Sequence, residues 1–132
     1  MRAWEARNHV KYLLVFAGGG LGAVLRYWAQ GLVYHRVGSA FPYGTILVNI
    51  IGCFVIGLLM VSLEERFLAT PALRLFLTVG ILGGFTTFSS FSFETMALVR
   101  DGESGLALAN VGLSVLVCLG ATWTGMKLGR LV

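Results

Sequence analysis

Charged residues are scarce in this sequence: Asp, Glu, Lys and Arg together make up 12% of its 132 residues. Soluble domains carry about a quarter, because a surface that faces water needs them. Hydrophobic residues make up 57% of the chain, and the mean hydropathy is +0.83. This balance excludes a soluble globular domain and indicates a protein embedded in a membrane. The net charge of +4 does not favour nucleic-acid binding, since the basic residues flank apolar segments, as they do at membrane surfaces.

The sequence also lacks the residue clusters that metal sites and active sites need. Its two cysteines, Cys53 and Cys118, each lie within an apolar segment and lack CxxC spacing, so neither a metal site nor a disulfide framework is predicted. There is no phosphate-binding loop, and no nucleophile has an evident base. We therefore do not expect an enzyme.

Long stretches without charge predict the fold. Residues 37–63, 75–93 and 104–126 can each cross about 30 Å of hydrocarbon, which takes roughly 20 apolar residues. A fourth apolar segment begins near Tyr12 and contains Arg26; we expect a retained helix with a buried arginine rather than a cleaved signal peptide, since no small-residue cleavage site is evident. The predicted fold is an all-α integral membrane protein, a single domain over residues 1–132, with transmembrane helices at about 11–34, 43–63, 72–99 and 104–127.

Basic residues and glycines predict topology and packing. Seven Lys or Arg lie at the N-terminus, the second loop and the C-terminus, against two on the other side, Arg36 and Arg100, which favours cytoplasmic termini. Glycine occurs 18 times, and small residues mark the contact faces of membrane helices, as we expect for Gly18, Gly22 and their neighbours. Four tightly packed helices leave little room for a pore, so we expect a complete pathway to need a second copy.

The most distinctive segment is GGFTTFSSF, residues 83–91, in the middle of the third predicted helix. Two glycines and four hydroxyl residues weaken a helix in lipid, so we predict a break here. Irregular backbone at membrane depth persists only when it is buried in protein or lines a cavity. Its freed carbonyl groups can coordinate a cation and its freed N–H groups can face an anion. The alternative is a kinked helix with hydroxyls bonded to their own carbonyls.

Other polar or aromatic residues at membrane depth leave two interpretations open. Phe88 and Phe91, spaced i, i+3, either pack against lipid and core or present electropositive ring edges to a small anion. Asn49 either binds a neighbouring helix or donates hydrogen bonds to an anion. Arg26 either reaches the headgroups or concentrates anions at a vestibule. Glu94 lies either at the membrane edge or at a pore mouth.

Three segments together resemble the Fluc (CrcB) family of small fluoride channels: GGLGAVLR at residues 19–26, GTILVNIIG at residues 44–52, and residues 83–91. The resemblance covers nearly the whole chain. It implies an antiparallel homodimer with two fluoride pathways along the interface. It also implies a central structural sodium ion, held by the backbone carbonyls of Gly83 and Thr86 at the third-helix breaks of both copies.

The same resemblance assigns residues to the fluoride pathway. They are Asn49, the ring edges of Phe88 and Phe91, the vestibule arginine Arg26, the hydroxyls of Ser89 and Ser114, and the carboxylate of Glu94. Asn110 stands where some members have a tyrosine, one turn before that serine, which leaves its role open.

The implied function is passive, fluoride-selective export through the cell (inner) membrane. An antiparallel pair requires the chain to insert in both orientations, for which Lys and Arg should be balanced between the two sides. The seven-to-two distribution is more biased than that, so dual insertion follows from the resemblance alone. The alternatives are a dual-topology small-molecule exporter, for which Glu94 is the candidate buried carboxylate, and a non-conducting assembly subunit.

Overall fold

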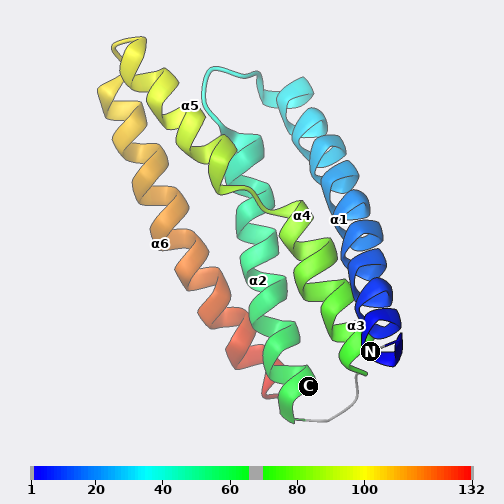
Figure 1. Cartoon of the computed structure of the whole chain (residues 1–132). Helices are drawn as coiled ribbons and strands as arrows, with labels where there is room; N and C mark the ends of the chain where they lie inside the picture. Colours follow the sequence, from blue (N-terminus) through cyan, green and yellow to red (C-terminus); the bar gives the residue numbers. More distant parts are fainter. Residues whose placement is uncertain (1, 66–69, 132) are drawn as a thin grey trace.

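The computed structural model describes residues 2–65 and 70–131, with side chains described over 8–63 and 70–131, and these residues form helices and short loops without strands. The elements in chain order are α1 (Arg2–Val37), α2 (Tyr43–Glu65), α3 (Pro71–Leu75), the π-helix η1 (Phe76–Leu82), α4 (Gly83–Phe85), α5 (Phe88–Arg100) and α6 (Ser104–Gly129) (Figure 1). The third span comprises α3 to α5. Four helical stretches are long and apolar enough to cross a membrane, at Asn8–Val37, Tyr43–Leu63, Pro71–Arg100 and Ser104–Gly129. The predicted all-α membrane fold with four spans and a broken third helix is confirmed.

The helix ends differ from the predicted ones mainly in α1. This helix begins at Arg2 rather than near residue 11, because the polar N-terminal residues continue the helix beyond the apolar part. It ends where Gly38 adopts a φ of 81°, a conformation that costs little only for glycine. Gly102, at φ 83°, makes the corresponding turn between α5 and α6. The loop expected between the second and third predicted helices, residues 64–71 with their charged side chains, lies largely outside the described residues.

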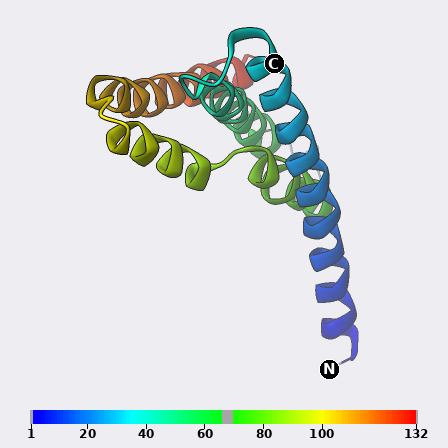
Figure 2. The same cartoon turned by 90° about the horizontal axis from the view of Figure 1, so that it is seen from above.

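The helices are arranged around α2, which packs along α6 on one side and against α1 on the other. The lower half of the third span lies against α1, whereas α5 pairs with α6 (Figure 1). Both ends of the chain lie at the same end of the bundle in this view, as four spans require. The N-terminal end of α1 projects away from the other helices (Figure 2).

Glycines bring the helix backbones into close contact. A Cβ at Gly22 of α1 would collide with the carbonyl of Ile81, and one at Gly18 would lie 2.9 Å from Gly80 Cα. These contacts confirm the predicted glycine face at Gly18 and Gly22, whereas a Cβ at Gly19 or Gly20, which we expected on the same face, would meet open space. Between the parallel helices α2 and α6, a Cβ at Gly57 would collide with the carbonyl of a facing residue. Close backbone packing of this kind is the usual way in which membrane helices associate.

A single chain covers little of its own surface. In the most apolar window of each span, between 11% (first span) and 28% (second span) of the residues are buried. The buried core is correspondingly small and includes Val48, Leu82 and Phe91. Most of the remaining surface is therefore available to lipid or to another protein.

Candidate functional site

The third span is interrupted at Thr86 and Thr87, whose backbones are extended. Gly83 keeps a helical φ of −62° and ψ of −36°, so the two glycines do not form the break themselves. Gly84 instead allows close packing, since a Cβ there would collide with the carbonyl of Gly19 on α1. The hydroxyl of Thr87 caps the new helix by accepting a hydrogen bond from Ser90 N (3.2 Å). The break lies within the predicted segment, three residues later than its first glycine.

Asn49 of α2 holds the break in place. Its Nδ2 donates to the carbonyl oxygen of Thr87 (3.0 Å), and its Oδ1 accepts from the N–H of Thr87 (2.8 Å). Both bonds go to backbone atoms that a continuous helix would have paired internally. The side chain thus joins α2 to the third span, the first of the two uses left open above. One of its two amide hydrogens remains for another acceptor.

The carbonyl groups of residues 83–86 lose their helical partners at the break, and those of Gly83 and Thr86 are among them. In a continuous helix Gly83 O would accept from Thr87 N, but that N–H donates to Asn49. Thr86 O would accept from Ser90 N, but that N–H donates to the hydroxyl of Thr87. The last backbone hydrogen bond before the break runs from Thr86 N to Leu82 O (3.0 Å). Gly83 and Thr86 are the residues whose carbonyls were predicted as cation ligands.

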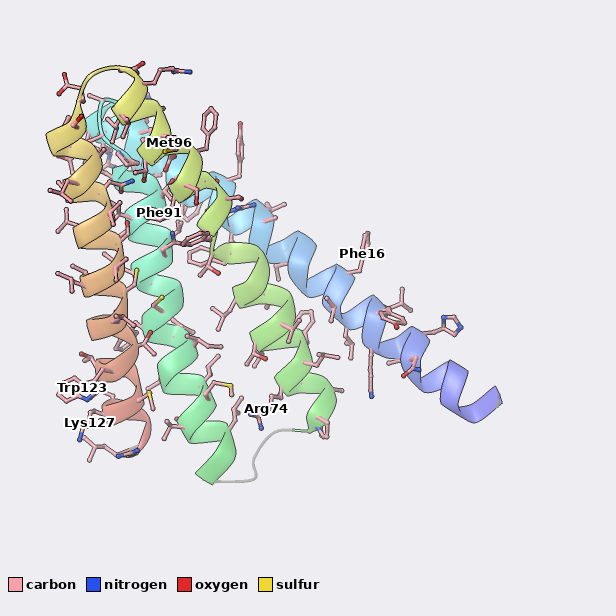
Figure 3. All side chains as sticks on the ribbon, turned by 60° about the vertical axis from the view of Figure 1, so that its left-hand side comes forward. Phe16, Arg74, Phe91, Met96, Trp123 and Lys127 are labelled. Carbon is pink, nitrogen blue, oxygen red and sulfur yellow. The ribbon has the colours of Figure 1, made fainter. Side chains whose placement is uncertain are left out.

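Phe88 and Phe91 open α5 directly after the break. Their ring centroids are 5.3 Å apart and the rings are tilted by 50°, so the two rings share one face as their spacing predicted. Phe91 is 8% exposed and lies at the level of the break (Figure 3), whereas Phe88 is 77% exposed. One ring is therefore anchored within the chain, and the other projects from it.

A groove of about 550 Å³ lies beside the break, between α2, the third span and α6. It collects several of the predicted site residues on one surface, namely Asn49, Gly83, Thr86, Phe88, Phe91 and Ser114. Its other walls are mostly aliphatic. Ser89 is exposed and lies outside this lining, with its hydroxyl 3.2 Å from that of Thr87.

Asn110 is buried between α5 and α6 and is 1% exposed. Its Nδ2 donates to the hydroxyl of Thr95 (2.8 Å), and its Oδ1 accepts from Ser114 (3.4 Å). Thr95 donates in turn to the carbonyl of Phe91 (2.7 Å). This series of hydrogen bonds connects the backbone of Phe91 on α5 to Ser114 on α6. Thr95 was not predicted from the sequence, because it lies 15 residues before its partner.

Glu94 belongs to a second polar cluster, nearer the α1–α2 loop. Its Oε1 accepts from Thr45 (2.8 Å) and Tyr34 (3.2 Å), and Gln30 donates to the Thr45 hydroxyl (3.0 Å). Its other oxygen, Oε2, is buried without a hydrogen-bond partner among the described residues. Tyr34, Gln30 and Thr45 were not predicted as site residues, although Thr45 lies within the GTILVNIIG segment.

Arg26 is not brought to the groove. It is partly exposed on α1, outside the residues that line the cavity. The structure therefore places one set of predicted residues at the break, Glu94 in its own cluster, and Arg26 apart from both.

Comparison with known proteins identifies the chain's relatives. The family model for CrcB-like proteins, described as Camphor Resistance (CrcB), matches residues 13–126. A protein from Geotalea daltonii named "Fluoride-specific ion channel FluC" is 52% identical over 121 residues, covering 90% of this chain and 98% of the relative. Proteins of the same name from Geotalea uraniireducens and Solibacter usitatus are 52% and 50% identical, covering 92% of this chain and 96% and 99% of their own lengths.

These matches include the segments that form the break, the groove and the Glu94 cluster. The chain is therefore a multi-pass membrane protein that belongs to the CrcB-like family.

Proposed function

We propose that this chain is a passive, fluoride-selective channel that exports cytoplasmic fluoride through the cell membrane as an antiparallel homodimer. The observation that carries the proposal is the break at Thr86–Thr87, braced by Asn49, with Phe88 and Phe91 at its edge. Curated relatives at about half identity, matched over nearly their full length, bear the name of a fluoride-specific channel.

The exposed polar surface at the break supports a second copy. Irregular backbone at membrane depth must be covered by protein or face a water-filled cavity. Here Phe88 and Ser89 are exposed, and the groove beside them is open on one side. A second subunit placed over this face would enclose the groove, and two-fold symmetry would then produce two equivalent pathways.

Fluoride holds its hydration water strongly, so a narrow pathway must offer donors in place of water. The second amide hydrogen of Asn49 and the hydroxyls of Ser89 and Ser114 can serve, as can the free N–H groups at the start of α5. The ring edges of Phe88 and Phe91 add weaker attraction. Binding then remains weak enough for the ion to leave, as conduction requires. Arg26 would attract anions at a vestibule.

Glu94 and Asn110 have supporting positions in this proposal. Glu94 would line the pathway nearer the α1–α2 loop, where its Oε2 has no partner among the described residues. Asn110 would hold Ser114 in place, since Ser114 donates to its side-chain oxygen.

The carbonyls of Gly83 and Thr86 suit a sodium ion. Both have lost their helical N–H partners, and hard cations prefer oxygen ligands. Gly83 and Thr86 of one chain provide two ligands, so two facing copies would be needed to surround the ion. The charge of a bound sodium would raise the local positive potential and hold the two broken helices together.

Efflux from liposomes that contain only the purified protein tests the function. We expect fast fluoride loss, little chloride loss and no requirement for a proton gradient. Fluoride flux that depends on a proton gradient would favour the exporter. Absence of flux from well-folded protein would contradict the channel in the form of a homodimer.

Phenylalanine variants test the ring-edge role. Isoleucine has no electropositive ring edge, so Phe88→Ile and Phe91→Ile should each reduce fluoride flux strongly. Only Phe91→Ile should also lower stability, because Phe88 is 77% exposed. Phe93→Ile is the matched control on the same helix, 72% exposed and outside the groove, and should leave flux unchanged. Unchanged flux in Phe88→Ile would contradict this role.

A further inference from the structure

The two cysteines face each other across the contact between α2 and α6. These helices run parallel, and the close approach at Gly57 brings the carbonyl of Thr122 against α2. Cys53 and Cys118 each lie four residues, about one turn, before these contact points, so they meet at the same level. Their side chains are close enough to interact directly. Neither forms a disulfide.

Both thiols also line the 550 Å³ groove. Each cysteine is partly exposed, so a small ion that enters the groove can reach both sulfurs. No group of three or more His, Cys, Asp or Glu side chains suited to a metal occurs among the described residues. The pair therefore offers two soft ligands, too few for the tetrahedral coordination that zinc requires.

We propose that Cys53 and Cys118 form a two-coordinate binding site for thiophilic cations such as Cu(I), Ag(I) and Hg(II). Soft thiolate ligands select such ions, and these ions accept linear coordination by two sulfurs. For Hg(II) each thiol releases its proton to water and forms one sulfur–metal bond, so the product is a neutral bis-thiolate complex and two protons. No oxidant or reductant is needed.

The position of this site predicts its effect. Cys53 lies one turn after Asn49 on α2, and Cys118 lies one turn after Ser114 on α6. All four residues line the same groove. A bound ion would therefore obstruct the groove beside these two polar residues. This effect on transport rests on the proposed channel function, whereas binding itself does not.

Competition with a monothiol tests binding without any transport measurement. The purified full-length protein is loaded with one equivalent of Hg(II), titrated with glutathione and followed by native mass spectrometry. Two converging ligands raise affinity by a factor on the order of 10² or more over one. We expect the native chain to retain its ion at about 10²-fold more glutathione than Cys53→Ser or Cys118→Ser. Each variant keeps one thiol and is a matched control for simple mercury labelling.

Loss of the ion from the native chain at the same glutathione concentration as from either variant would overturn the proposal. Size-exclusion profiles of the two variants establish that they remain folded. In liposomes, Hg(II) should then block fluoride efflux by the native chain and spare the Cys53→Ser/Cys118→Ser double variant. If the native chain retains the ion but shows no efflux before mercury is added, the channel function fails while the thiol site stands.

Discussion

Replacement of Asn49 by leucine should lower the free energy of unfolding, and no second side-chain change should recover this loss. Leucine has the same branched shape and the same number of side-chain heavy atoms but removes both hydrogen bonds to the backbone of Thr87, which are 2.8 and 3.0 Å long. Thr87 is 7% exposed, so its N–H loses its partner in a poorly hydrated place. An unpaired buried donor costs about 1–3 kcal/mol. We expect the free energy of unfolding to fall by about that amount.

Equilibrium unfolding in mixed micelles, with increasing fractions of a denaturing detergent, measures this loss. Asn110→Leu is the matched control, because Asn110 donates to a side chain, the hydroxyl of Thr95. Adding Thr95→Val and Ser114→Ala removes both side-chain partners of Asn110 as well and should recover much of the loss in the control, since replacing all members of a hydrogen-bonded group by apolar groups can be nearly neutral.

No such second change exists for Asn49, because its partners are backbone atoms. A stability of Asn49→Leu within about 0.5 kcal/mol of the native value would refute the bracing role. If fluoride flux were lost at unchanged stability, Asn49 would act on the ion alone.

Two further changes test the packing and the second polar cluster. Gly22→Ala places a Cβ against the backbone carbonyl of Ile81, which cannot move aside, and should lower the unfolding free energy by about 1–3 kcal/mol. In the control Gly20→Ala the new Cβ meets open space, so the unfolding free energy should not fall. Equal effects of the two changes would contradict the close contact at Gly22. Tyr34→Phe removes a 3.2 Å hydrogen bond to Glu94 and should lower the unfolding free energy by about 1 kcal/mol in the same mixed-micelle unfolding assay. The control Tyr27→Phe changes a side chain that is 82% exposed and should have no effect.

The sequence analysis located the break to within a few residues but not its cause. The run of glycine and hydroxyl residues marked the weak point, because such residues are poor helix formers in lipid. Gly84, however, packs against α1, Gly83 keeps a helical conformation, and the break follows them at Thr86 and Thr87. The π-helix before the break, residues 76–82, was also missed. It carries no signal in composition, because it depends on how the turn is packed.

The roles of the polar residues were harder to predict. For Asn49, residue type alone allowed a helix contact or an anion donor, and only the position of Thr87 showed the helix contact. For Glu94, the partners Thr45 and Tyr34 lie 49 and 60 residues away in the sequence. The cysteines lacked the spacing of a metal site because their juxtaposition arises from two separate helices.

The sequence by itself determined the membrane class, the four spans, the approximate place of the break and the family resemblance. It did so because a bilayer of nearly fixed thickness sets the length of each apolar stretch, and because helix-weakening residues are local in the chain. Only the tertiary structure decided that Asn49 braces Thr87, that Glu94 meets Tyr34 and Thr45, and that Cys53 faces Cys118. These contacts depend on how each helix is rotated and how far it is shifted along its neighbour. Both quantities are set by the close approach of glycine backbones, which hydropathy and composition do not encode.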